Sequence, residues 1–343
     1  MQKVNIILIG FGRVGKAFHD LLREKYDYCR DRYGLQLELR AIIRRNGTLR
    51  LSGTRELMAS SESPGGETAE PGTWNPALTL DELLEEFHSG VVVDCTPSDL
   101  KTGEPGFGYI HRALSSGWHV ATASKGALVV HPAELETAAR LNNVALKASG
   151  ATAAALPALD VGLHSLAGAE ILAIEGILNG TTNYILSRMH EGVSFSRALI
   201  EATEKGIAEP DPTQDIEGWD TAAKMVIIAN RVLKTRFSLS EAIVNGINGL
   251  TEEIVQRALN IGKVIKLIGR CARQDHLSPW KIEVGLALLN PDHPLARVDG
   301  SNKGIIFYTD CMGYIFVSGG KSNPRGAAAS ILKDIISIYW HGY

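Results

Sequence analysis

The segment from Glu209 to Lys224 holds the side chains of this 343-residue chain that are best placed to move protons. It reads EPDPTQDIEGWDTAAK, and its two prolines keep the acidic first part out of a helix. The stretch 219–229 is small or apolar apart from Asp220 and Lys224, whose i, i+4 spacing puts them on one helix face. A charged pair on an otherwise buried helix, beside an acidic loop that carries Asp215, predicts a site that binds an amine and transfers a proton. The alternative is a surface ion pair, worth about 0.3–0.5 kcal/mol.

A glycine-rich turn near the N-terminus indicates a nucleotide site. Residues 4–9 (VNIILI) form an apolar run typical of a buried strand, GFGRVG follows at once, and residues 16–22 predict a helix. In a G-x-G-x-x-G turn, Gly10 permits the tight bend, Gly12 lets backbone approach a pyrophosphate, and Gly15 lets helix and strand pack closely. The helix N-terminus adds free N–H groups for the phosphates, so we predict a dinucleotide cofactor.

The end of the second predicted strand indicates which cofactor binds. That strand covers residues 37–43 (LELRAII), and Arg44 and Arg45 follow it. Enzymes that use NAD usually place an acidic residue there for the ribose 2′-hydroxyl. Two guanidinium groups instead suit a 2′-phosphate, which arginine binds through two hydrogen bonds. The pattern therefore favours NADP, with NAD as the alternative. If no ligand binds here, Arg44 and Arg45 are simply part of a solvated basic turn.

Polar residues follow two further predicted strands. Residues 91–94 (VVVD) read as a buried strand that precedes Thr96, and residues 118–124 (WHVATAS) read as a strand that precedes Lys125. In doubly wound sheets, ligands bind beyond the carboxyl ends of the strands. We therefore expect Thr96 and Lys125 at the edge of the sheet where the ligands bind.

The order of these elements predicts an α/β protein with two domains. Strands and helices alternate through residues 1–150, which indicates an N-terminal Rossmann dinucleotide-binding domain. A polar segment at 46–78, rich in Gly, Ser, Pro and Glu, interrupts this alternation. Residues 151–319 mix strands with helices, which predicts an α+β domain with a largely antiparallel sheet. A C-terminal helix within about 320–343 is expected to return to the first domain.

Composition excludes several classes of protein. With 45% hydrophobic and 21% charged residues, the chain can bury a large core, and a net charge of -3 argues against nucleic acid as a main partner. It has no run of 18 apolar residues, and the first predicted strand begins at residue 4, so neither a membrane span nor a signal peptide is expected. The four cysteines are scattered and the histidines lack metal-binding spacing. We therefore expect a cytoplasmic protein that binds a small molecule and no metal.

Several motifs together make the chain resemble the homoserine dehydrogenase family. They cover nearly the whole chain, and the last of them is the most specific. The matching segments are GFGRVG at 10–15, DCTPS at 94–98, HVATASKGAL at 119–128, NGTTNYIL at 179–186 and KGIAEPDPTQDIEGWDTAAK at 205–224.

The resemblance implies the NAD(P)-linked interconversion of L-homoserine and L-aspartate 4-semialdehyde, in threonine and methionine biosynthesis. It implies that Lys224 relays the proton and that Lys125 assists at the substrate. The implied substrate contacts are Glu209, Asp215, Asp220, Gly180 and Thr181, and the implied cofactor contacts are Phe11, Gly12, Arg13, Val14, Thr96 and Lys125. The resemblance also implies that the second domain is the catalytic and dimerisation domain, and that the protein is a homodimer or a dimer of dimers.

Three departures from the family pattern leave alternatives open. Lys147 stands where many members have a glutamate beside a sodium ion, and residues 319–326 (GGKSNPRG) replace a G-P-G-A-G-like loop. The chain ends at Tyr343, so no regulatory amino-acid-binding domain is expected. The alternative functions are an NADP-linked oxidoreductase acting on another small amino-acid aldehyde or alcohol, and an inactive NADP sensor. Cys95 suits a small buried side chain better than the nucleophile that aspartate-semialdehyde dehydrogenase needs.

Overall fold

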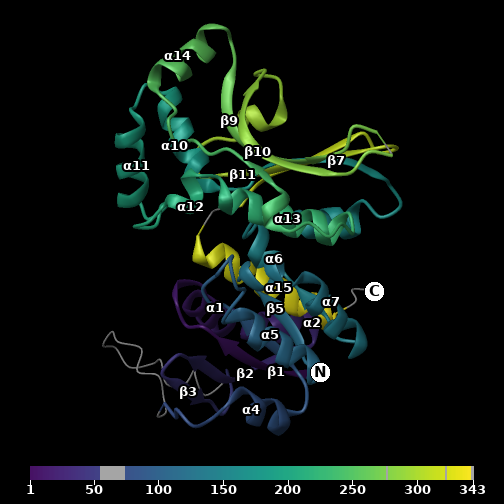
Figure 1. Ribbon diagram of the computed structural model, residues 1–343. Coiled ribbons are helices and arrows are strands. Elements are labelled where there is room, and N and C mark those ends of the chain that lie inside the picture. Colours follow the sequence, from purple (N-terminus) through teal and green to yellow (C-terminus); the bar gives the residue numbers. More distant parts are fainter. Residues whose placement is uncertain (55–73, 276, 321–322, 341–343) are drawn as a thin grey trace. The chain divides into compact units, whose positions relative to one another are not determined.

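The computed structural model describes residues 1–54, 74–275, 277–320 and 323–340, shown as ribbons in Figure 1. The chain divides into two compact units, one made of Met1–Ala151 and Pro324–Tyr343 and the other of Thr152–Asn323. Much of the polar segment at 46–78 lies outside the described residues, and so do positions 321 and 322 of the 319–326 loop.

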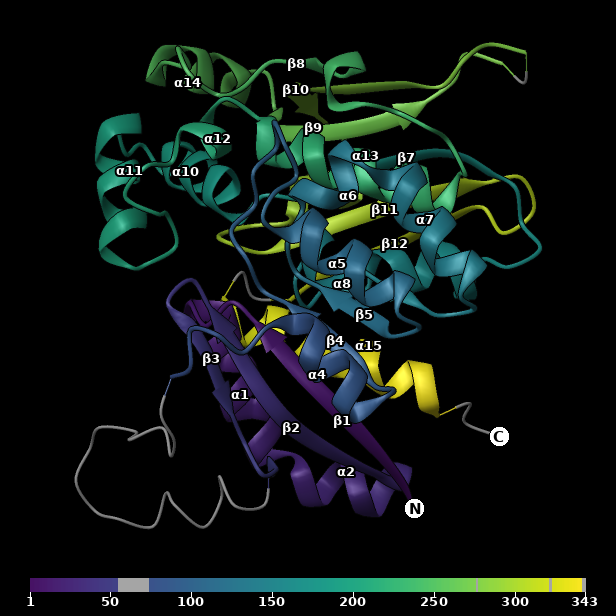
Figure 2. The same ribbon diagram turned by 60° about the horizontal axis from the view of Figure 1, so that its bottom comes forward.

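The first unit is built on a parallel sheet. In its described part, six strands follow the order β3-β2-β1-β4-β5-β6, all neighbours being parallel except β2 and β3 (Figures 1 and 2). From β1 the chain runs outward to β2 on one side and to β4 and β5 on the other, which is the doubly wound order that the sequence predicted. The strands are β1 (Gln2–Ile9), β2 (Leu35–Arg44), β3 (Gly47–Arg50), β4 (Val91–Asp94), β5 (His119–Thr122) and β6 (Leu146–Lys147).

Helices follow the strands of this unit and the C-terminal helix joins them. Ile331 and Ile335 of that helix are fully buried in the same apolar core as Phe18, Ile6 and Val91. Burying each such side chain stabilises the fold by roughly 1.5–3 kcal/mol. The helices are α1 (Arg13–Glu24), α2 (Tyr26–Tyr33), α4 (Leu80–Phe87), α5 (Gly106–Ser115), α6 (Gly126–Val130), α7 (Pro132–Leu141), α8 (Ser149–Thr152) at the sequence boundary of the units, and α15 (Pro324–Tyr339).

One strand of the first unit differs from the sequence prediction. β3 lies inside the segment treated as a polar interruption, where residues 47–50 pair antiparallel with the end of β2. Backbone hydrogen bonds between Thr48 and Asn75 hold its other edge. The strand is held by its pairing partners on both edges, and not by an apolar pattern of its own, so its polar sequence did not predict it. At the other edge of the sheet, β6 has only two residues, because Ser149 already begins α8.

The second unit is built on a largely antiparallel sheet, as the sequence predicted. In its described part, six strands follow the order β12-β11-β7-β9-β10-β8, and only β10 and β8 are parallel. A hairpin joins β11 to β12 through residues 310–313. The strands are β7 (Ile171–Ile177), β8 (Ile243–Val244), β9 (Val264–Ala272), β10 (Lys281–Leu289), β11 (Lys303–Thr309) and β12 (Tyr314–Gly319).

Helices α10 and α13 pack on this second sheet, and α13 carries the predicted pair Asp220 and Lys224. Ile185 and Met189 of α10 and Ala222 of α13 share one buried cluster with Leu267 of β9 and Val284 of β10. The helical segments are α9 (Ala158–Asp160), η1 (Val161–Ser165), α10 (Gly180–His190), α11 (Phe195–Glu204), α12 (Thr213–Ile216), α13 (Trp219–Val232), η2 (Leu239–Glu241), α14 (Glu252–Asn260) and η3 (Pro294–Arg297).

Candidate active-site residues

The glycine turn between β1 and α1 has the shape that a dinucleotide requires. Gly10 has φ +85°, and a Cβ atom there would lie 2.5 Å from the carbonyl oxygen of Cys95. A Cβ atom at Gly15 would lie 2.1 Å from the carbonyl oxygen of Gly10, so any side chain would force helix and strand apart. A Cβ atom at Gly12, the N-cap of α1, would meet nothing within 4 Å, which leaves room for a pyrophosphate at the helix N-terminus. Of the other predicted turn residues, Phe11 and Val14 are half-buried and Arg13 is exposed.

Arg44 lies beside this turn, between two aromatic rings. Its guanidinium carbon is 4.6 Å from the ring centroid of Phe11 and 4.1 Å from that of Trp74. Such stacking holds a guanidinium plane by about 0.5–2 kcal/mol per ring. Arg44 ends β2 and is half-buried, whereas Arg45 is exposed. Nothing in the sequence around Trp74 indicated that it would meet Arg44, because 29 residues of chain separate them.

Thr96 and Lys125 follow the neighbouring parallel strands β4 and β5, so both lie at the carboxyl edge of the first sheet, as predicted. Thr96 is buried and donates through its Oγ1 to the Oδ1 of Asp94 at 2.7 Å. Lys125 is half-buried, and its backbone N–H donates to the Oγ of Ser98 at 2.8 Å. Sequence analysis named neither Asp94 nor Ser98 as a site residue.

In the second unit, α13 brings Asp220 and Lys224 together as the i, i+4 spacing predicted. The Nζ of Lys224 lies 2.5 Å from the Oδ2 of Asp220 and donates to the carbonyl oxygen of Leu178 at 3.0 Å. The side chain of Lys224 is 13% exposed and that of Asp220 is 11% exposed, which rules out the reading as an ordinary surface pair. The lysine is therefore held in place and only partly open to solvent.

Asn179 joins this pair to a second acid. Its Nδ2 donates to the Oδ1 of Asp215 at 2.6 Å and to the Oδ2 of Asp220 at 2.7 Å, so one amide group bridges two carboxylates. The Oδ1 of the same side chain accepts from the backbone N–H of Thr182 at 2.9 Å and caps α10. Sequence analysis did not name Asn179 as a site residue. An asparagine before a helix is an ordinary capping signal, so only the tertiary contacts show that Asn179 also bridges two carboxylates.

The electrostatics of this group suit a cationic ligand. Burial raises the pKa of Asp215, and the negative charge of Asp220 raises it further. Lys224 and hydrogen bonds from Asn179 and Thr181 act in the opposite direction. Two carboxylates face a single ammonium, so the ionised group carries an excess of negative charge. An amine bound here as an ammonium would neutralise that excess.

The remaining predicted substrate residues differ in how deeply they are buried. Gly180 and Thr181 are buried in the first turn of α10, and Thr181 donates through its Oγ1 to the carbonyl oxygen of Ile207 at 3.2 Å. That contact ties α10 to the segment that leads into the acidic loop. Glu209 lies on this segment and is exposed.

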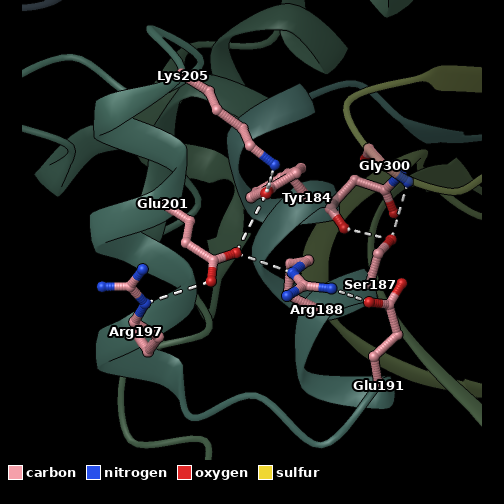
Figure 3. A network of polar contacts seen from close by, with 9 residues as sticks. Tyr184, Ser187, Arg188, Glu191, Arg197, Glu201, Lys205 and Gly300 are labelled. Carbon is pink, nitrogen blue, oxygen red and sulfur yellow. Dashed lines mark hydrogen bonds and ion pairs between the residues drawn. The ribbon is translucent and has the colours of Figure 1, made fainter.

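A polar network fixes α10 against α11, just before that segment begins (Figure 3). The Nζ of Lys205 donates to the hydroxyl of Tyr184 at 2.7 Å, and this hydroxyl donates to Glu201 at 3.4 Å. Glu201 also accepts from the Nε atoms of Arg188 at 2.9 Å and Arg197 at 3.3 Å. Lys205 is the C-cap of α11, so the network includes the C-terminal end of that helix.

Other observations limit the chemistry. Among the described residues, no group of three or more His, Cys, Asp or Glu side chains could hold a metal ion. Burial raises the pKa of the Cys95 thiol well above its usual range, which leaves it protonated and unsuited to nucleophilic attack. No helix in the part of the chain that the structure describes has the length and apolar character needed to cross a membrane.

Comparisons with known proteins point to one family. A family model described as homoserine dehydrogenase matches residues 157–336, and the model of the homoserine dehydrogenase NAD binding domain matches residues 10–148. A homoserine dehydrogenase of Methanocaldococcus jannaschii is 36% identical over 345 residues, covering 98% of each chain. An NAD(+)-dependent homoserine dehydrogenase of Pseudomonas canavaninivorans is 32% identical and covers 99% of this chain and 97% of its own.

Solved structures agree with the sequences. A crystal structure of a putative homoserine dehydrogenase from Archaeoglobus fulgidus matches with a TM-score of 0.85 and 32% identity, covering 98% of this chain and 99% of that one. A hyperthermophilic archaeal homoserine dehydrogenase in complex with NADPH matches with a TM-score of 0.80 and 27% identity, covering 98% of both chains.

Proposed function

Because the chain belongs to the homoserine dehydrogenase family of NAD(P)-dependent oxidoreductases, we propose that Lys224 is its proton-transferring residue and that the acids around it bind the substrate amine. The family reaction interconverts L-homoserine and L-aspartate 4-semialdehyde. The observation that carries the proposal is the buried group of Asp215, Asp220 and Lys224, bridged by Asn179. These are the side chains that an amino-acid aldehyde requires.

The geometry suggests how this group works. Reduction of an aldehyde builds negative charge on the carbonyl oxygen, which a positioned ammonium stabilises and protonates. The Nζ of Lys224 has three N–H bonds, and Asp220 with the carbonyl oxygen of Leu178 accounts for two of them. The third is available to the substrate oxygen. Asp215 is then the acid that receives the substrate ammonium, because Lys224 donates to Asp220 instead, and the pKa of Asp215 is raised. Gly180, Thr181 and Glu209 are proposed to complete the contacts with the substrate.

In the first unit, we assign the nicotinamide dinucleotide to the glycine turn. Gly10, Gly12 and Gly15 provide the open backbone and the N-terminus of α1 for the pyrophosphate. Thr96 and Lys125 at the carboxyl edge of the sheet are proposed to line the cofactor, with Lys125 also assisting at the substrate. When bound, the cofactor supplies or accepts the hydride, and the protein orients it.

The direct test is absorbance at 340 nm with purified protein, L-homoserine and NADP, then NAD. We expect reduction of the cofactor that depends on homoserine. Binding of NADPH without turnover on homoserine, but with turnover on another small amino-acid alcohol, would instead support the related oxidoreductase. Binding without turnover on any such substrate would support the sensor.

The stacked guanidinium of Arg44 predicts a preference for NADP. Replacing Arg44 by glutamine removes the charge that would bind a 2′-phosphate, so we expect the KM for NADP to rise about 10- to 100-fold while the KM for NAD changes little. The matched control is Arg50→Gln, because Arg50 is an exposed arginine on β3 that pairs with Glu86. An equal loss with both cofactors would mean that Arg44 acts through packing on Phe11 rather than through the phosphate.

The raised pKa of Asp215 predicts a pH dependence of substrate binding. As the pH falls through that pKa, which lies above the ordinary value of 3.8, Asp215 becomes neutral and attracts the substrate ammonium less. The KM for homoserine should therefore rise as the pH is lowered from neutrality, and Asp215→Asn should remove this rise. Asp211→Asn is the control, because hydrogen bonds from Thr213 hold the pKa of the exposed Asp211 below its usual range. A slope that survives in Asp215→Asn would contradict the assignment.

We also propose that the protein is a cytoplasmic homodimer, or a dimer of dimers, formed through the second sheet. Tyr314 of β12 is 58% exposed, and its ring centroid lies 6.4 Å from that of Tyr308 on β11. Tyr308 donates to Glu175 of β7 at 3.1 Å, so aromatic and charged groups share one sheet face. Light scattering after size-exclusion chromatography measures the oligomeric state. The free thiols of Cys29, Cys95, Cys271 and Cys311 suit a reducing compartment.

A further inference from the structure

A fully buried carboxylate lies between the two loops that carry Thr96 and Lys125. Asp94, the last residue of β4, is 0% exposed. Its Oδ1 accepts from the backbone N–H of Thr96 at 3.0 Å and from its hydroxyl at 2.7 Å. Its Oδ2 accepts from the hydroxyl of Thr122, the last residue of β5, at 2.7 Å. One side chain thus connects the ends of two neighbouring strands.

The contacts continue from Thr122 to the residues on either side of the next turn. The hydroxyl of Thr122 accepts from the backbone N–H of Ser124 at 2.9 Å. The hydroxyl of Ser98, in the loop after β4, accepts from the backbone N–H of Lys125 at 2.8 Å and lies 3.3 Å from the hydroxyl of Ser124. The backbone before and at Lys125 is therefore held from the β5 side through Thr122 and from the β4 side through Ser98.

The first turn of α5 closes over this group. A Cβ atom at Gly106 would lie 3.1 Å from the hydroxyl oxygen of Thr96, 3.4 Å from that of Ser124 and 3.5 Å from the Oδ2 of Asp94. The hydrogen bonds that Asp94 accepts come from the neutral groups of Thr96 and Thr122, and burial raises its pKa. Burying an acid in this way costs stability that a small apolar residue would not cost. Packing alone gives no reason for a carboxylate here.

We propose that Asp94 is a positioning residue of the dehydrogenase reaction, which sets the loops of Thr96 and Lys125 relative to each other through Thr122. The inference rests on the proposed roles of Thr96 and Lys125. A displacement of about 1 Å in a reacting group can lower a rate by roughly a hundredfold. Loss of this connection should therefore lower turnover more than it lowers the stability of the fold.

The test compares variants that differ only in hydrogen bonding. Thr122→Val keeps the volume and removes the hydroxyl, whereas Thr122→Ser keeps the hydroxyl, and Asp94→Asn keeps the shape while replacing one acceptor by a donor. Val93→Ala is the matched control, because Val93 is a fully buried residue of β4 whose truncation leaves a cavity outside the network. Each protein is measured for melting temperature, kcat with homoserine, and NADPH affinity by fluorescence titration.

We expect Thr122→Val and Asp94→Asn to lower kcat at least tenfold and to weaken NADPH binding several-fold, and Thr122→Ser to remain within about threefold of wild type. Val93→Ala should lower the melting temperature and keep kcat and NADPH affinity. A decrease in kcat that follows melting temperature across all four proteins would overturn the inference, and so would an unchanged Thr122→Val. If Asp94→Asn does not fold, the comparison of Thr122→Val with Thr122→Ser tests the inference by itself. If wild type does not act on homoserine, the proposed function fails, whereas the NADPH titrations still test the role of Asp94.

Discussion

Replacing Lys224 by alanine is expected to lower kcat by about 10²–10⁴-fold, the range for loss of a positioned general acid. The variant keeps the fold, because the lysine lies at the margin of the core with 13% of its side chain exposed. What it loses is the ammonium that donates to Asp220 and to the carbonyl oxygen of Leu178. The measurement is the initial rate of NADPH formation at saturating homoserine, with the melting temperature as a check on folding.

Two further variants make the result specific to proton transfer. Lys224→Arg keeps a positive charge beside Asp220, but a guanidinium does not give up its proton near neutral pH, so turnover should stay low. Lys281→Ala removes an exposed lysine of β10 in the same unit and should leave kcat unchanged. A kcat for Lys224→Ala within a few-fold of wild type would remove Lys224 from the mechanism.

Replacing Asn179 by alanine is expected to lower kcat/KM for homoserine about a hundredfold. The bridging amide would no longer donate to Asp215 and Asp220, and hydrogen bonds to charged groups contribute about 1.5–3 kcal/mol each. The two carboxylates would then repel each other with fewer donors around them, which raises the pKa of Asp215 further and weakens its attraction for the substrate ammonium. Steady-state kinetics with homoserine as the varied substrate measures this loss.

The capping role of Asn179 must be separated from its bridging role, since loss of an N-cap alone costs about 1 kcal/mol. Asn179→Asp keeps a good cap for Thr182 but puts a third carboxylate beside Asp215 and Asp220, so it should be less active than Asn179→Ala. Thr251→Ala is the control, because it removes the N-cap of α14 in the same unit and should reduce stability without reducing kcat/KM. High activity in Asn179→Asp would show that the cap, and not the bridge, matters.

Local patterns in the sequence were enough for the elements that depend on neighbouring residues. The glycine turn after residues 4–9 and the helix at 219–229 agree with β1 and α13, because tight bends and helix faces are set by residues a few positions apart. The pair Asp220 and Lys224 was predicted for the same reason: four residues of helix fix their distance. The alternation of strands and helices predicted the doubly wound first sheet.

Contacts between distant segments were beyond such patterns. The bridge that covers the outer edge of β3 depends on Asn75, and the stacking of Arg44 depends on Trp74, which is separated from it by 29 residues of chain. Asn179 reads as an ordinary helix cap until α12 and α13 bring Asp215 and Asp220 to its amide group. Hydrogen bonds form over about 3 Å and in defined directions, so a sequence does not show which distant partners meet.

By itself, then, the sequence predicted the kind of chemistry and the residues proposed for it: the cofactor turn, the lysine proposed to transfer the proton, and its adjacent acid. Motif residues lie close together along the chain, and their spacing alone sets their geometry. Tertiary structure alone decided which residues hold them in place, namely Asn179 between two acids and Asp94 between two strand ends. Asn179 and Asp220 are 41 positions apart in the sequence, and Asp94 and Thr122 are 28 positions apart. The path of the folded chain, and not local spacing, therefore sets the distance between these side chains.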